Sequence, residues 1–537
     1  MQIEPGEIIH ANGTDGNLYT VIGYSKSDDT LHLVRLHTLP PVKGLLVPLD
    51  DEALVNTADA AKKSIPLCAN VWETKSVQAT DVTTTGARLT SRAVDRLLRA
   101  LGRSVARSHY HAVHAPSPFK ANRSVVPVSG KCWGPEEMES LCEASLDFWL
   151  TSGRFAEAFE QALAQRLGRR YALAVNSGSS ANLLAIAALC SPLLKERRLM
   201  PGDEVITVAA GFPTTVSPLV QLGLTPVFVD VTPPTYNAVA EQVAAAITER
   251  TRAIFMAHTL GNPFDLTTIR TVAQKHDLWL VEDSCDALGS TYTLAGNIGM
   301  CGSFGHLATF SFYPAHHITM GEGGAVVCDD PLLRKIVLSL RDWGRDCWCA
   351  PGADDTCTRR YTWKFPLLPE GYDHKYVYSH LGYNLKITDM QAAVGVEQLK
   401  RLTAFTALRK RNFALLTEAL APLEGGPLTL PRATPHSDPS WFGYLLTIEK
   451  NYDRADLLQY LNYRRIGTRL LFAGNITNQP CFEGVSHRVA ANLLGTDKIM
   501  QRTFWIGLYP ALTEDHILYA AHTLREYFKK QRSPRLK

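Results

Sequence analysis

One segment organises the sequence, Thr309-Phe-Ser-Phe-Tyr-Pro-Ala-His-His-Ile-Thr-Met-Gly-Glu-Gly-Gly324. It begins as a short apolar strand, turns at Pro314, carries two adjacent histidines and returns through glycines into the apolar strand Ala325-Val-Val-Cys328. This pattern is typical of a loop that carries a reactive group. An unperturbed histidine has a pKa of about 6.5, so a histidine in such a loop can move a proton near neutral pH.

The segment resembles the reactive-lysine loop of the fold-type I pyridoxal-phosphate (PLP) sugar aminotransferases, the DegT/DnrJ/EryC family. In those enzymes a lysine five residues before the Gly-Glu-Gly-Gly run bonds covalently to the coenzyme, and His316 occupies that position here. Histidine is not a primary amine, so the resemblance implies a coenzyme that is bound without a covalent tether. The alternative is a degenerate aminotransferase loop with a structural histidine pair.

A histidine at this position is similar to the nucleotide-sugar 3-dehydrases of the family, which use pyridoxamine phosphate (PMP). The resemblance implies C3 deoxygenation of a nucleotide-linked 4-keto-6-deoxyhexose, with a CDP-linked sugar as the expected substrate and a lipopolysaccharide 3,6-dideoxyhexose as the expected product. It also implies electrons from a flavin-iron-sulfur, NADH-dependent reductase. His316 is the expected base, Tyr313 is expected beside the coenzyme and His317 beside the substrate.

Composition indicates an ordinary globular protein. Of the 537 residues 45% are hydrophobic and 20% charged, and the net charge is only +3. We therefore expect no general affinity for nucleic acid or membrane. The sequence shows neither a signal segment nor an apolar run of about 18 residues, so we expect a cytoplasmic protein whose eleven cysteines stay reduced.

The N-terminal part lies outside the resemblance. Residues 1–85 alternate turn signals with β-rich runs and predict a small β-rich module of unknown role. Residues 86–118 predict an arginine-rich helix, about Leu89 to Val105, and a linker. We expect the helix to pack by its apolar stripe, with polyanion binding as the alternative. His109, His111 and His114 lie in the predicted linker, where we expect a mobile loop rather than a metal site.

Strands and helices alternate from about residue 171 onward, which predicts an α/β fold with a mainly parallel sheet between helices. The resemblance implies the fold-type I transferase fold, with a large coenzyme domain at 119–390 and a small α/β domain at 391–537. Ligands of such sheets bind beyond the carboxyl ends of the strands.

Phosphate binding is predicted where the strand Tyr171–Val175 runs into Asn176-Ser-Gly-Ser-Ser180 and a helix. Free backbone N–H groups and the positive end of the helix dipole favour an anion there. The family pattern places Ser179 and Ser180 at the coenzyme phosphate. It also places Phe212 over the pyridine ring, where a core aromatic residue is the alternative.

Two carboxylates follow the next strand. The strand Leu278–Asp283 ends in Asp283, which the resemblance pairs with the pyridine nitrogen, so that the ring can accept electrons. Asp286 is implied as a second residue beside the coenzyme. Either carboxylate could instead cap a helix.

Four cysteines form the predicted iron-sulfur set. Cys347, Cys349 and Cys357 have the spacing Cys-x-Cys-x7-Cys, and the resemblance supplies Cys285 as the fourth ligand of a 2Fe-2S cluster. The gap from Cys285 to Cys347 is longer than the family spacing, and we expect the extra residues in a surface turn at 292–297. Zinc binding and free thiols are the alternatives.

Two further residues are implied as ligand contacts. Asn384 resembles the residue that reaches the coenzyme phosphate of a neighbouring subunit, which implies a homodimer with shared sites. Arg469 resembles a contact to the substrate diphosphate, with a surface salt bridge as the alternative. Other readings of the chain are a reductase-independent PMP dehydratase and a non-catalytic coenzyme- or sugar-binding regulator.

Overall fold

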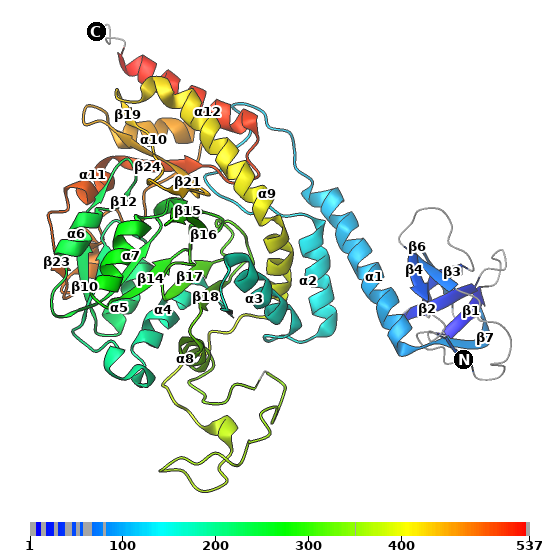
Figure 1. Ribbon diagram of the computed structural model, residues 1–537. Helices are drawn as coiled ribbons and strands as arrows, with labels where there is room; N and C mark the ends of the chain where they lie inside the picture. The colour runs from blue at the N-terminus through cyan, green and yellow to red at the C-terminus, as the bar shows by residue number, and fades with distance from the viewer. Residues whose placement is uncertain are drawn as a thin grey trace. The chain divides into compact units, whose positions relative to one another are not determined.

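The computed structural model describes residues 90–349 and 351–532, together with the backbone of the strands between residues 7 and 89. The chain forms two compact units (Figure 1), one of residues 1–116 with 134–148 and one of residues 117–133 with 149–537. The domain boundaries expected from the sequence remain predictions. The grouping of residues 134–148 with the N-terminal unit was not foreseen.

The first unit contains a seven-stranded antiparallel sheet in the order β4-β6-β3-β2-β1-β7-β5. Its strands are β1 (Glu7–Ala11), β2 (Leu18–Ser25), β3 (Thr30–His37), β4 (Leu46–Leu49), β5 (Leu54–Asn56), β6 (Leu67–Gln78) and β7 (Val82–Leu89). The helices are α1 (Ser91–His109), its continuation η3 (Tyr110–His114) and α2 (Pro135–Asp147). The sequence prediction of a loop at His109 to His114 is therefore wrong, because the backbone continues helically.

Helix α1 packs against α2 and is tied to it by charge. Its arginines form ion pairs with acids of α2, from Arg99 to Asp147 at 2.9 Å and from Arg107 to Glu139 at 2.6 Å. Leu97 is buried in the apolar stripe of α1. Such pairing satisfies these arginines within the unit, which favours the packing role over the polyanion-binding alternative.

An eight-stranded sheet forms the centre of the second unit, in the order β23-β10-β9-β13-β14-β17-β18-β8. The strands are β8 (Tyr171–Val175), β9 (Glu204–Val208), β10 (Thr225–Val229), β13 (Thr251–Ala257), β14 (Trp279–Asp283), β17 (Leu307–Ser311), β18 (Gly324–Cys328) and β23 (Arg488–Val489). The pairs from β23 to β17 are parallel, and β18 is antiparallel to both of its neighbours. Figure 1 shows these strands surrounded by helices.

Both faces of this sheet are buried. Along β9 and β13, Ile206 and Ile254 belong to one apolar cluster, whereas Val205 and Phe255 belong to another. Strands that are covered on both faces consist of continuous runs of apolar residues, so they could be predicted from the sequence. The helices of this domain are α3 (Arg154–Leu167), α4 (Gly178–Leu189), α5 (Pro213–Gln221), α6 (Ala240–Ala245), α7 (Leu266–Lys275) and α8 (Pro331–Arg341).

Helix α9 (Asp389–Leu420) leads into a four-stranded sheet in the order β19-β21-β24-β22. Its strands are β19 (Leu428–Thr429), β21 (Gly443–Ile448), β22 (Thr468–Arg469) and β24 (Thr503–Gly507), with helices α10 (Arg454–Tyr463), α11 (Leu494–Arg502) and α12 (Glu514–Arg532). A separate apolar cluster stabilises this part, with Leu446, Phe504 and Phe528 wholly buried. Among the described residues, no helix combines the length and apolar character that a membrane span requires.

The turn predicted at 292–297 is a hairpin of β15 (Thr291–Leu294) and β16 (Asn297–Met300). Positive φ angles at Ala295 and Gly296 form the turn between them. Tyr292 is not a surface residue, because its ring is buried and its hydroxyl lies 3.0 Å from that of Thr267. The remaining short strands are β11 (Val231–Thr232), β12 (Asn237–Ala238) and β20 (Ser437–Asp438).

Candidate active site

A cavity of about 1000 Å³ lies where the strands β8, β14 and β17 reach their carboxyl ends. Ser177 follows β8, Asp283 ends β14 and Ser311 ends β17, and all three line the cavity. This is the edge at which parallel α/β sheets bind ligands. Its volume lies at the upper end of the range for small-molecule sites, about 300–1000 Å³.

One wall is the turn into helix α4. The Ser177 hydroxyl caps the helix by accepting a hydrogen bond from the Ser180 backbone N–H at 3.0 Å. Ser179 lines the cavity, whereas the Ser180 side chain bonds the Ser177 hydroxyl at 3.0 Å and does not line it. A Cβ at Gly178 would lie 2.4 Å from that of Ser311, so only glycine allows this close approach. The turn therefore presents N–H groups and the positive end of α4 to a bound anion.

Asp283 forms the floor and is only 4% exposed. Its Oδ2 accepts hydrogen bonds from Asn182 Nδ2 at 2.9 Å and from Thr215 Oγ1 at 2.7 Å, and its Oδ1 accepts from the Cys285 N–H at 3.2 Å. Asn182 is oriented in turn by the Thr309 hydroxyl, which donates to Asn182 Oδ1 at 2.6 Å. These donors fix the orientation of the carboxyl group, which suits a contact to the pyridine nitrogen of the coenzyme.

His316 lines the same cavity as Asp283. Its Nε2 is 3.3 Å from Asp286 Oδ1, and its Nδ1 is buried with no hydrogen-bond partner among the described residues. Burial raises the pKa of Asp286, and the neighbouring His316 opposes this shift. With Nε2 turned toward the Asp286 carboxyl group, Nδ1 is the ring nitrogen that is left without a protein partner among the described residues.

Arg409 of helix α9 supports this loop from below. It is wholly buried, and its guanidinium donates to the carbonyl oxygens of Trp441 at 3.2 Å, Phe442 at 3.1 Å and His316 at 3.4 Å. Burial lowers the pKa of Arg409 to about 10, which leaves it cationic at neutral pH. No motif in the sequence points to Arg409, because only the fold brings α9 next to the loop.

Aromatic and basic side chains complete the cavity wall. Phe212 and Tyr313 line it and are each 52% exposed, and the Phe212 ring contacts Phe472 edge-on at 5.6 Å. An exposed aromatic ring in a cavity is available for stacking, which disfavours the core role for Phe212. Arg469 also lines the cavity and donates to the Thr468 carbonyl at 2.9 Å.

The expectation that His317 contacts substrate is corrected by the structure. His317 is 3% exposed and does not line the cavity, and its Nε2 lies 2.6 Å from the Ser440 carbonyl oxygen. Burial lowers the pKa of His317 well below its usual value. The ring is therefore neutral and holds the loop to the small domain.

Asn384 is exposed and does not line the cavity of its own chain, and its Oδ1 accepts a hydrogen bond from Lys386 Nζ at 2.9 Å. Its expected role in a neighbouring subunit remains a prediction.

The four cysteines lie in two places. Cys285 lines the coenzyme cavity, where burial raises its pKa well above the usual value. Figure 1 shows a long loop after α8. Cys347, Cys349 and Cys357 belong to this loop and line a small hollow in it. Across residues 90–349 and 351–532, no group of three or more histidine, cysteine or acidic side chains is arranged to hold a metal ion. The described geometry therefore does not assemble the predicted cluster.

The cavity does fit PLP or PMP. The turn at Ser177 to Ser179 suits a phosphate, Asp283 suits a ring nitrogen, and Phe212 offers an exposed aromatic ring in the same cavity. No lysine lines the cavity, so the residues described there provide no covalent tether for the coenzyme.

Comparison with known proteins agrees with this geometry. The model of the DegT/DnrJ/EryC1/StrS aminotransferase family matches residues 131–525. The chain is 56% identical over 416 residues to the lipopolysaccharide biosynthesis protein RfbH of Salmonella typhimurium, which covers 77% of this chain and 94% of that protein. It is 50% identical over 452 residues to the dTDP-4-dehydro-2,6-dideoxy-D-glucose 3-dehydratase of Saccharopolyspora spinosa, covering 84% and 95%.

Among solved structures, the GDP-4-keto-6-deoxy-D-mannose-3-dehydratase of E. coli with bound hydrated PLP is similar, with a TM-score of 0.66 and 29% identity. That likeness covers 74% of this chain and 99% of the other. The fold is that of the fold-type I PLP-dependent transferases, as the sequence predicted. The chain belongs to the DegT/DnrJ/EryC1/StrS aminotransferase family.

Proposed function

We propose that this chain is a nucleotide-sugar 3-dehydratase that uses PMP to remove the C3 hydroxyl of a 4-keto-6-deoxyhexose. The observation that carries the proposal is His316, which stands where the family has its covalent lysine and lies 3.3 Å from Asp286 inside the coenzyme cavity. The 3-dehydratase names of relatives from Saccharopolyspora spinosa and Yersinia pseudotuberculosis support the same reaction class.

Bound PMP supplies an amino group that combines with the C4 ketone and a ring that accepts electrons when a neighbouring proton leaves. Asp283 holds the ring nitrogen in its protonated form. His316 accepts the proton at Nδ1, because Asp286 occupies Nε2. The positive charge that develops on the His316 imidazole would be stabilised by the Asp286 carboxylate. His316 would then return its proton to the departing C3 hydroxyl, which leaves as water and restores the neutral imidazole.

His316 also explains why dehydration is proposed rather than amino-group transfer. A lysine at this position would capture the coenzyme after each turnover, whereas an imidazole moves protons without competing for it. Water can then release the product. An aminotransferase activity is disfavoured for the same reason.

The finer substrate assignment extends the proposal. CDP-4-keto-6-deoxyglucose is the substrate we would test first, which would make the protein a CDP-4-keto-6-deoxyglucose 3-dehydrase of lipopolysaccharide biosynthesis. The name of the Salmonella typhimurium relative supports the pathway, whereas the relatives named as 3-dehydratases act on dTDP- and GDP-linked sugars. Arg469 at the cavity wall is the proposed diphosphate contact.

The reductive half of the proposal depends on the cysteines. A 2Fe-2S cluster on Cys285, Cys347, Cys349 and Cys357 would take electrons from a flavin-iron-sulfur reductase. Three of these thiols line one hollow, which supports the proposal, but Cys285 lines a different cavity. Iron and sulfide analysis of anaerobically purified protein, beside Cys349→Ser, tests this part alone. If the protein contains zinc or no metal, the cluster is ruled out and the reductase-independent dehydratase becomes the proposed function.

A homodimer with shared sites completes the proposal, with Asn384 reaching the partner's coenzyme phosphate. It is supported by the exposure of Asn384 and by its position outside its own cavity.

The reaction itself is tested by mass spectrometry of sugar products. The PMP-loaded protein is incubated with CDP-, dTDP- and GDP-linked 4-keto-6-deoxyhexoses, each with a reductase and NADH. Loss of the C3 oxygen from one of them is the expected result, and His316→Asn should abolish it. Transfer of an amino group from glutamate to C4 would instead establish an aminotransferase.

A further inference from the structure

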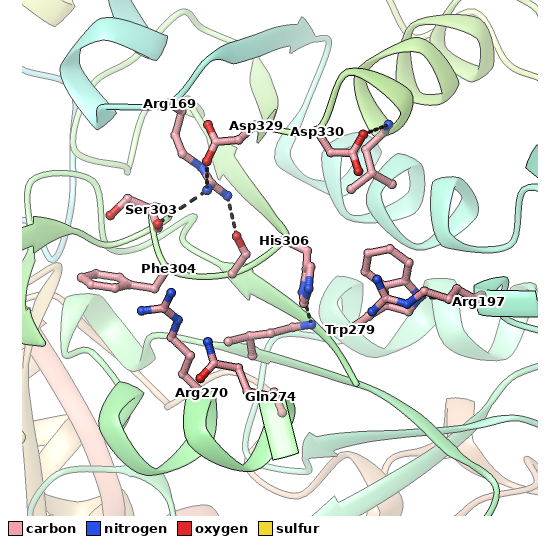
Figure 2. A pocket seen from close by; sticks show the side chains of 14 residues that line it. Arg169, Arg197, Arg270, Gln274, Trp279, Ser303, Phe304, His306, Asp329 and Asp330 are labelled. Atoms are coloured by element: carbon pink, nitrogen blue, oxygen red, sulfur yellow. Dashed lines mark hydrogen bonds and ion pairs between the residues drawn. The ribbon is translucent and has the colours of Figure 1, made fainter. Parts of the chain in front are cut away.

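A second cavity, of about 360 Å³ and shown in Figure 2, is lined by residues at the opposite edge of the same sheet. Trp279 begins β14, His306 immediately precedes β17 and Arg169 precedes β8 by two residues, and all three line this cavity. The parallel strands therefore begin here and end at the coenzyme cavity. The length of β14, five residues at about 3.3 Å each, separates the two.

Basic side chains line this second cavity from three elements. Arg169, Arg197 and Arg270 come from the segment before β8, from η4 (Pro192–Arg197) and from helix α7. Figure 2 shows them around the same space with His306 between them. The acidic residues that line it are Asp329 and Asp330.

Arg169 is fixed in place and 5% exposed. Its guanidinium pairs with Asp329 at 2.6 Å and donates to the Gly305 carbonyl at 2.7 Å. Its Nε is buried and has no hydrogen-bond partner among the described residues. Arg169 is therefore a rigid part of the cavity wall.

Arg197 is held by stacking. Its guanidinium lies 3.9 Å from the centre of the Trp279 ring, and the indole N–H donates to the Arg197 carbonyl at 2.8 Å. Its ion pair with Asp277 joins it to a carboxylate that is 81% exposed. Such an exposed pair contributes little, so Arg197 can exchange Asp277 for a ligand anion.

Arg270 lines this cavity from helix α7. Within the described part of the chain, it makes neither a hydrogen bond nor an ion pair, although it is half-buried on helix α7 and lines the cavity. Gln274 lies one helical turn further along α7 and also lines the cavity. Together they offer a guanidinium fork and an amide to one ligand.

His306 adds a neutral donor. Its Nδ1 accepts the Leu280 N–H at 3.0 Å, so the neutral ring carries its proton on Nε2. The opposite wall is held rigid from within the sheet, since Glu282 accepts the N–H groups of Phe304 at 2.7 Å and Gly305 at 2.6 Å. The cavity is therefore preformed.

We propose that this cavity binds a sugar phosphate, with the phosphate on Arg270, Arg197 and His306. The guanidinium groups of Arg197 and Arg270 have no buried counter-charge, so their two positive charges match a phosphate dianion. Each guanidinium can also donate two hydrogen bonds to phosphate oxygens. The volume exceeds that of a bare ion and falls within the range of small-molecule sites. Gln274 and Asp330 line the remaining space and suit the hydroxyl groups of a sugar. This site is independent of the reaction proposed above.

Isothermal titration calorimetry of the PMP-loaded protein with glucose 1-phosphate tests the proposal, because PMP fills the other phosphate cradle. The wild-type protein should bind, and Arg270→Gln should bind at least about ten-fold more weakly through loss of a charge-assisted hydrogen bond. Lys275→Gln is the matched control, since it removes a charge from the same helix at a residue outside the cavity. It should bind within about two-fold of the wild type.

Equal affinity in the wild type and Arg270→Gln would place the ligand elsewhere and overturn the proposal, as would absence of binding by the wild type. Uncharged glucose should not bind, and binding of glucose would contradict the role of the phosphate. Thermal melting of each variant checks that it is folded. Arg270→Lys, which keeps the charge without the fork, should bind with intermediate affinity.

Discussion

Replacing Asp283 by asparagine tests how the floor of the coenzyme cavity works. The carboxylate is surrounded by donors only, from Asn182, Thr215 and the Cys285 backbone. An asparagine has one oxygen and one NH2 group in place of two oxygens, so its NH2 group must face one of these donors. The variant therefore loses a buried acceptor as well as its charge.

The structure sets the size of two separate effects. One buried donor left without an acceptor costs about 1–3 kcal/mol in the free energy of unfolding of the coenzyme-free protein. The lost ionic hydrogen bond to the ring nitrogen should weaken PMP binding by about 10- to 100-fold. Urea denaturation measures the first effect, and fluorescence titration with PMP measures the second.

Asp230→Asn is a matched control. Asp230 is 6% exposed, and its carboxyl oxygens likewise accept hydrogen bonds from buried donors. These donors are the N–H groups of Gly495 at 2.7 Å and Thr496 at 2.8 Å and the Thr496 hydroxyl at 2.8 Å. It does not line the coenzyme cavity. This variant should lose similar stability and keep its affinity for PMP. Equal PMP affinities for Asp283→Asn and the wild type would refute the assignment of Asp283 to the ring nitrogen.

Two other predictions concern His317 and Gly178. Burial lowers the pKa of His317 in the folded protein, so below about pH 6.5 the unfolded chain binds a proton that the folded chain does not. The free energy of unfolding of the wild type therefore falls as the pH is lowered, by up to about 1.4 kcal/mol per pH unit. His317→Gln lacks this loss, so urea denaturation should show the stability gap between wild type and variant narrowing from pH 6.5 to 5; a constant gap would contradict the neutral buried ring. Gly178→Ala places a Cβ 2.4 Å from that of Ser311, and this overpacking should cost about 1–3 kcal/mol of stability and weaken PMP binding. Unchanged PMP affinity in Gly178→Ala would show that the turn does not approach the phosphate.

The sequence predicted much of the sheet because its strands are buried on both faces. The predicted strand at 171–175 has the bounds of β8, and the strand predicted at 278–283 differs from β14 by one residue at its start. The fold also gathers Ser179, Phe212, Asp283 and His316 around one cavity, and these are residues that the family resemblance assigned to the coenzyme site. Their roles in binding and catalysis remain predictions.

Residues that act through distant segments could not be predicted in this way. Asn182 and Thr215 look like ordinary helix residues in the sequence, and only the fold brings both to Asp283. His316 and His317 are neighbours with the same side chain, yet one lines the cavity and the other binds the Ser440 carbonyl. Which histidine turns inward depends on packing against the small domain, and adjacency in the loop carries no information about it.

Exchange of the C3 oxygen with solvent tests the central claim most directly. The PMP-loaded protein is incubated with CDP-4-keto-6-deoxyglucose in H2(18)O without a reductant, and the sugar is then reduced with borohydride and fragmented in a mass spectrometer. Reversible loss of the C3 hydroxyl predicts label at C3 that depends on PMP and is absent in His316→Asn, beside the spontaneous label at C4. Label confined to C4 in the wild-type protein, with this sugar and with its dTDP- and GDP-linked counterparts, would contradict the proposed dehydration.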